Sequence, residues 1–178
     1  MFQIPTTAEN TVMIAPSFLT PTQAHEAFEA IVLPGILNAM ENWHVKRPHL
    51  HVVVVDPTIA YGHPAAETPF LFQHSIGRDD WADDYQRYAQ AKARLSWRTG
   101  LSSREVVLTK PHLLLPGNTH FWGSAIVGGI ITACSGVESY WDEAFAGMTS
   151  AALCGEASYN AAQYMKRDDA PDFLPRHP

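Results

Sequence analysis

The spacing of apolar residues changes several times along the chain, and each change marks a predicted element. Apolar positions recur at helical spacing over residues 24–43, directly after the segment TPTQ at residues 20–23. Thr20 and Gln23 are placed to form a capping box, so a helix is predicted to begin here. Pro34 is expected to kink or interrupt this helix, because proline lacks a backbone N–H donor.

Residues 49–56 (HLHVVVVD) form the clearest strand in the sequence. Four consecutive valines predict that this strand is buried on both faces, as in the centre of a covered sheet. Further strands are expected at residues 59–64, 70–75, 106–107, 124–127 and 130–134. Gly128-Gly129 joins the last two and predicts a hairpin.

Two longer helices complete the pattern. Residues 81–99 carry a face of small side chains, with Asp79 or Asp80 as the expected N-cap and Gly100 as the end. Residues 142–165 are rich in alanine. The order of helix, strands, helix, strands and helix predicts an α+β domain in which helices pack on an antiparallel sheet.

The length of 178 residues fits a single domain over residues 1–178. Residues 1–18 are Thr- and Pro-rich and are expected to form an irregular arm, and residues 166–178 a flexible tail. Only 17% of residues are charged, which leads us to expect that a homo-oligomer, a dimer or larger, covers part of the surface.

The formal net charge of −6 and the lack of a Lys/Arg cluster argue against nucleic acid as a partner. No apolar run approaches the roughly 20 residues that span a bilayer, so no membrane partner is expected either. Cys134 and Cys154 form no CxxC pair, and the N-terminus lacks a basic segment followed by an apolar run. We therefore expect a soluble, cytoplasmic protein with reduced thiols.

Three segments carry a resemblance to a known family. Residues 129–147 (GIITACSGVESYWDEAFAG) read as a strand ending in Ser-Gly, five residues, Asp142, and a helix with Ala-Gly. This is similar to the closing segment of the GlcG / PduO C-terminal / HbpS superfamily, the haem-degrading-domain-like proteins. The strand at 49–56 and the Lys-Ala helix around Lys92 follow in the family's order, and residues 122–126 (WGSAI) stand where it has Gly-Gly-x-Pro-Ile.

The resemblance implies a profilin-like α-β-α sandwich with a central antiparallel sheet packed by helices. It also implies homo-oligomers, from dimers to octamers. Some family members bind haem or iron, and one subgroup is fused to a cobalamin adenosyltransferase. Haem is therefore a possible ligand, and a transition metal is a second possibility.

Histidines supply the first candidate chemistry. His49 and His51 are two residues apart on a strand, so both imidazoles point to one face in a geometry that suits a transition metal. The alternative is that they are polar residues at the solvated start of the strand. His74 ends another strand beside aromatic residues, as an axial ligand or proton carrier would, and Arg78 follows to clamp a carboxylate.

Lys92 supplies the second candidate. It lies on the small-residue face of the 81–99 helix, where an ammonium group is costly to bury without a partner. Asp142 or the carboxylate of a ligand is the expected partner. We predict one ligand pocket, formed by His74, Arg78, Lys92, Trp122, Gly123, Ser124 and Asp142.

The leading interpretation is an oligomeric domain that binds a small ligand, haem or another planar, acid-bearing molecule. One alternative is a small histidine- or metal-assisted enzyme that acts on a pathway intermediate. Another is a non-catalytic accessory subunit. The sequence holds no P-loop or dinucleotide fingerprint and no G-x-S-x-G nucleophile motif.

Overall fold

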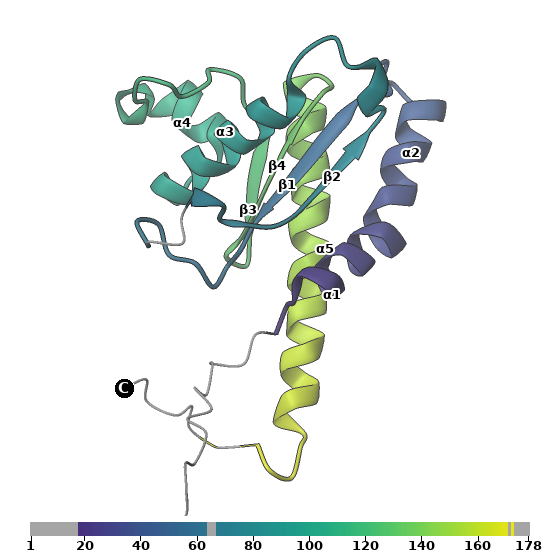
Figure 1. Cartoon of the computed structure of the whole chain (residues 1–178), viewed down its shortest axis with the longest axis vertical. Helices are drawn as coiled ribbons and strands as arrows, with labels where there is room; N and C mark the ends of the chain where they lie inside the picture. Colours follow the sequence, from purple (N-terminus) through teal and green to yellow (C-terminus); the bar gives the residue numbers. More distant parts are fainter. Residues whose placement is uncertain (1–17, 64–66, 171, 173–178) are drawn as a thin grey trace, which may run out of the picture.

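The computed structural model describes residues 18–63, 67–170 and 172. Four antiparallel strands form one sheet in the order β2-β1-β4-β3 (Figure 1). The strands are β1 (Leu50–Val55), β2 (Phe70–Ile76), β3 (Ser124–Val127) and β4 (Ile130–Ser135). Helices cover both faces of this sheet, which confirms the predicted α+β sandwich.

One face of the sheet packs against α1 (Pro21–Ala27), a π-helical turn (Phe28–Val32), α2 (Leu33–Asn42) and the long α5 (Ser139–Met165). The other face packs against α3 (Tyr85–Thr99). The short α4 (Ser103–Thr109) follows α3 on the same side (Figure 1).

Strand β1 lies at the centre of the sheet, as its four valines predict. It pairs with β2 on one side and β4 on the other. Val52 packs toward α2 and α5, while Val53 packs against Ala89 and Ala93 of α3. A residue on β1 therefore faces α3 or the α1–α5 layer according to its parity, and this alternation decides where each candidate site residue lies.

The first helix begins as predicted, because Thr20 and Gln23 form both halves of a capping box. The interruption expected at Pro34 occurs one turn earlier, as the π-helical turn of residues 28–32. There the N–H of Leu33 donates to the carbonyl of Phe28, five residues back. A wide turn of this kind is one way to adjust a helix near a proline, which offers no N–H of its own.

The structure corrects several predicted elements. Residues 59–63 form turns rather than a strand, and residue 64 lies outside the described residues. Helix α3 begins at Tyr85 with Asp84 as its N-cap, so neither Asp79 nor Asp80 caps it. Helix α5 begins at Ser139, three residues earlier than expected.

The predicted edge strand at residues 106–107 is wrong, because these residues lie in α4. The side chain of Ser102 accepts a hydrogen bond of 3.2 Å from the N–H of Glu105 and caps this helix. The spacing Ser-x-x-Glu outweighs the strand preference of two adjacent valines.

The hairpin of β3 and β4 forms through Gly128-Gly129 as predicted. Both cysteines are free, with Cys134 buried and Cys154 partly buried. No helix in the described part of the chain is long and apolar enough to cross a membrane. Most of the expected arm (1–18) and the end of the expected tail (166–178) lie outside the described residues.

Candidate functional site

A buried ion pair joins α3 to the start of α5. The Nζ of Lys92 donates to Oδ2 of Asp142 at 2.9 Å and to the carbonyl of Cys134 at 2.8 Å. The two side chains are only 1% and 2% exposed. The partner that the sequence demanded for Lys92 is therefore Asp142. Two of the three N–H donors of the ammonium group are used in these contacts.

Gly123 allows the chain to pass close to this ion pair, and Gly136 allows it to pass close to the start of β1. Gly123 has φ +144°, and a Cβ there would lie against Asp142 and 3.0 Å from the Nζ of Lys92. Gly136 has φ +145°, and a Cβ there would overlap the carbonyl oxygen of His49. Side chains are excluded at both positions by backbone conformation and by space.

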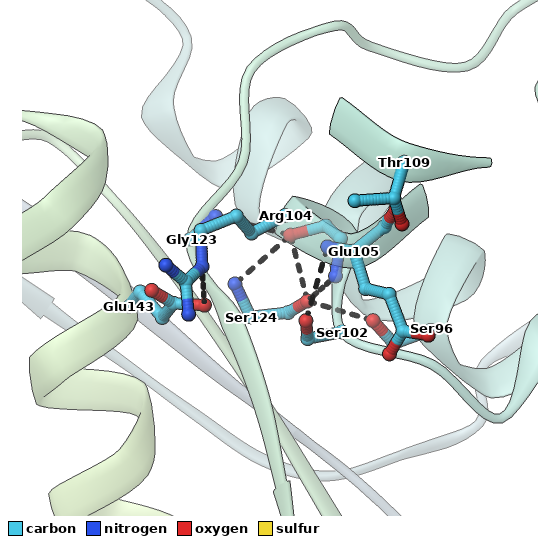
Figure 2. Close-up of polar contacts among 9 residues, drawn as sticks. Ser96, Ser102, Arg104, Glu105, Thr109, Gly123, Ser124 and Glu143 are labelled. Atoms are coloured by element: carbon cyan, nitrogen blue, oxygen red, sulfur yellow. Dashed lines mark hydrogen bonds and ion pairs between the residues drawn. The ribbon is translucent and has the colours of Figure 1, made fainter. Parts of the chain in front are cut away.

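A cluster of serines fixes the Gly123–Ser124 segment (Figure 2). The buried Oγ of Ser103 accepts hydrogen bonds of 3.0 Å from the backbone N–H of Gly123 and of Ser124. The Oγ of Ser124 in turn accepts from the N–H of Ser103 at 2.8 Å and lies 2.7 Å from the Oγ of Ser96. The cluster ties the start of α4 to the start of β3, next to the ion pair.

A cavity of about 170 Å³ opens beside Lys92 and Asp142, and we call it the α3–α5 cavity. Its lining consists of Arg47, Asp83, Tyr85, Tyr88, Lys92, Phe121, Ser135, Gly136, Val137, Ser139 and Asp142. Three of these side chains are aromatic, and the rings of Tyr88 and Phe121 meet edge to face at 5.6 Å. The cavity is therefore lined both by aromatic rings and by the charged side chains of Lys92 and Asp142.

Burial dominates the electrostatics of the ion pair. It raises the pKa of Asp142 from 3.8 to about 6, although the charge and hydrogen bond of Lys92 and the N–H of Val137 act in the opposite direction. Burial also raises the pKa of the Cys134 thiol well above its usual range, so that thiol stays protonated. Asp142 is thus mainly ionised at neutral pH and takes up a proton in mild acid.

Glu138, the N-cap residue of α5, places a second carboxylate near Asp142 and adds to the rise of its pKa. Its Oε2 is buried and has no hydrogen-bond partner among the described residues. A buried carboxylate oxygen without a donor is costly, so a donor from water or from a ligand would stabilise it.

The structure brings only part of the predicted pocket together. Lys92, Gly123 and Asp142 are in close proximity, and Ser124 lies next to Gly123 in the serine cluster. The ring of Trp122 instead packs under the guanidinium of Arg104, at 5.9 Å.

His74 and Arg78 do not belong to this group, which corrects the single pocket expected from the sequence. His74 pairs with Val52 in the sheet, and its ring packs 5.1 Å from that of Phe28. Strand alternation therefore turns His74 toward α1, on the face of the sheet opposite α3. Arg78 donates to Gln86 at 3.3 Å and lies over Trp81, away from the cavity lining.

His49 and His51 lie on the α3 side of the sheet, but their contacts are structural. His51 uses both ring nitrogens, at 2.9 Å from the Oγ of Ser75 and at 3.1 Å from Oε1 of Gln73. His49 lies 3.3 Å from the carbonyl of Gly77. Among the described residues neither histidine belongs to a group of three potential metal ligands, so nothing here favours a metal on this pair.

The sequence analysis did not identify the aromatic residues that line the cavity. Tyr85 and Tyr88 are seven and four residues before Lys92, which is the spacing of one helix face. That signal was present in the sequence. No local pattern pointed to Arg47 or Phe121, which reach the cavity only through the tertiary fold. No family model and no curated protein matches the chain.

Proposed function

We propose that the protein binds a small acid-bearing molecule in the α3–α5 cavity. The observation that carries this proposal is the position of Lys92 at the cavity wall, with a third N–H donor beyond the two that hold Asp142 and Cys134. A ligand carboxylate there would accept a charge-assisted hydrogen bond, the stronger class of hydrogen bond.

Two further features favour an anion in the same place. Helix α5 has 27 residues, and its first residue, Ser139, lines the cavity. The N-terminus of a long helix carries partial positive charge and attracts anions. Arg47, which is exposed, adds a full positive charge at the lining. Asp83 and Asp142 oppose these charges, so recognition depends on direct contact rather than on a broad positive field.

The size of the cavity favours a compact ligand over haem. Pockets that hold drug-sized molecules measure roughly 300–1,000 Å³, whereas the α3–α5 cavity measures about 170 Å³. The aromatic side chains of Tyr85, Tyr88 and Phe121 suit a flat ring. A planar acid with a single ring meets both conditions.

Benzoate and benzamide provide a matched test, because they share a shape and differ in charge. We expect benzoate to bind with roughly tenfold higher affinity than benzamide, a difference of about 1.4 kcal/mol. Both ligands can accept a hydrogen bond from Lys92, but only benzoate is attracted by the charges of Lys92 and Arg47. Isothermal titration with the full chain measures both. Arg47→Gln should weaken benzoate several-fold and leave benzamide unchanged, without loss of fold at this exposed position.

Two outcomes would count against an acid site in this cavity. One is equal affinity for benzoate and benzamide. The other is an Arg47→Gln protein that binds benzoate as the parent protein does. An exposed arginine remote from the lining, such as Arg167, serves as the control, and Arg167→Gln should change neither affinity.

We also propose that the protein is a homo-oligomer. Large apolar side chains are exposed on the helical layer, including Ile31 (61%), Leu37 (40%) and Met148 (43%). Exposed apolar side chains of this size are typical of surfaces that another subunit covers. Light scattering at micromolar concentration should give a mass of at least twice 19.7 kDa. A monomer mass would refute this proposal and leave the proposed acid site untouched.

A further inference from the structure

Three potential metal ligands meet on the face of the sheet that α1 covers, away from the lining of the α3–α5 cavity. They are His25 of α1, Glu29 of the π-helical turn and His74 of β2. One ligand atom from each lies within 4.8 Å of the other two. The sequence analysis proposed only His74 of these three as a site residue, and it placed His74 in one pocket with Lys92 and Asp142.

The distances fit a metal ion better than a plain hydrogen bond. Nε2 of His25 lies 3.4 Å from Nδ1 of His74 and 3.7 Å from Oε1 of Glu29. Ligands about 2.0–2.1 Å from a tetrahedral ion are separated from each other by about 3.3 Å. The two ring nitrogens already have this separation, and Glu29 needs only a small side-chain adjustment.

The two imidazole rings are held in place by their neighbours. The ring of His74 packs 5.1 Å from that of Phe28, and the ring of His25 packs edge to face against Phe72 at 5.6 Å. Rings fixed in this way lose little freedom when a metal binds.

We propose that His25, Glu29 and His74 form a binding site for a divalent first-row transition metal such as Zn²⁺. Two imidazole nitrogens and one carboxylate oxygen are donors that suit this class of ion. Three protein ligands leave one tetrahedral position open for water or an anion. The side chains of His25 and Glu29 are 40% and 50% exposed, so an ion can reach the site from solvent.

Zn²⁺ and Co²⁺ serve as probes on the full, untagged chain after treatment with a chelator. Calorimetry should show one Zn²⁺ per chain, and Co²⁺ should give the visible absorption of a tetrahedral site. His25→Gln and His74→Gln should each weaken Zn²⁺ at least about 100-fold, because loss of even a supporting contact to a metal ligand costs 10–100-fold. Glu29→Gln should lower the affinity for Zn²⁺ about tenfold or more.

His112→Gln is the matched control, since this exposed histidine lies outside the cluster. It should leave Zn²⁺ affinity unchanged, as should His49→Gln. His25 is half-buried and lies outside the hydrophobic core, so His25→Gln tests the site with little disturbance of the core, and circular dichroism verifies the fold of each variant. The proposal is overturned if His25→Gln binds Zn²⁺ as the parent does, or if the controls weaken binding equally. Neither result bears on benzoate in the α3–α5 cavity, which shares no lining residue with the cluster.

Discussion

Replacing Lys92 with methionine should lower the free energy of unfolding by about 3–5 kcal/mol at pH 8, because it leaves a buried carboxylate without its partner. Methionine keeps the length of the lysine side chain and removes its charge. Asp142 is only 2% exposed, so water can replace little of the lost contact. Urea unfolding of the two proteins at pH 8 measures this difference.

The loss of stability caused by Lys92→Met should be smaller in acid. The pKa of Asp142 is about 6 in the folded protein and its ordinary value is 3.8, so the folded state holds a proton at pH 5 that the unfolded state has lost. A carboxyl group with a raised pKa contributes stability below its unfolded pKa and loses it as pH rises through the folded pKa. Without Lys92 this folded pKa rises further, so the deficit of Lys92→Met should grow as pH rises from about 6 toward 8.

Two further variants show whether the lost charge or the lost packing causes the loss of stability in Lys92→Met. Lys110→Met removes a partly exposed lysine paired with Glu105 and should cost less than about 1 kcal/mol. Lys92→Met/Asp142→Asn removes both buried charges and should recover most of the lost stability. A deficit of equal size at pH 5 and pH 8 would show that lost packing, rather than the stranded carboxylate, causes the effect.

Ser103→Ala should lower the free energy of unfolding by about 2–4 kcal/mol, because each buried N–H without a partner costs about 1–3 kcal/mol. The missing hydroxyl group would leave the amides of Gly123 and Ser124 without their acceptor. Alanine is otherwise a good residue at the start of a helix, so no loss of helix propensity is expected. Chemical unfolding at neutral pH measures the change.

The neighbouring serine provides the control. Ser102 caps α4 through one hydrogen bond to the N–H of Glu105, so Ser102→Ala should cost about 1 kcal/mol. If Ser103→Ala costs no more than Ser102→Ala, solvent has replaced the missing oxygen. The Gly123–Ser124 segment would then depend on the sheet alone for its position.

Local sequence patterns predicted most of the fold. The valines of β1, the capping box at Thr20 and the glycines between β3 and β4 each determine structure within a few residues, and each was interpreted correctly. The errors arose where two local signals compete. At residues 106–107 the cap at Ser102 overrides two β-branched side chains. The start of α3 is set by Asp84, which follows the two aspartates, Asp79 and Asp80, that were expected to cap it.

The site was less predictable because it depends on the direction of side chains across the sheet. The cost of burying Lys92 predicted an anionic partner, since an unpaired buried ammonium group is too unfavourable to persist, and Asp142 was one of the two partners offered. His74 was assigned to the wrong face because the sequence gives the alternation of β2 but not which face α1 covers. The approach of His25 and Glu29 to His74 is a tertiary contact without a local signal.

Gly123 and Gly136 have a consequence for the ancestry of this chain. Neither Gly123 nor Gly136 can acquire a side chain without moving the backbone, and Lys92 and Asp142 cannot change independently of one another. Divergent descendants of the same ancestor should therefore keep Lys92 and Asp142 as a pair, with twelve residues between Gly123 and Gly136 and five between Gly136 and Asp142. The number of residues between Lys92 and Gly123 can change in the loop before Gly123. The histidines of the opposite face are under no such steric constraint, so they would be lost first in any lineage that has no use for a metal.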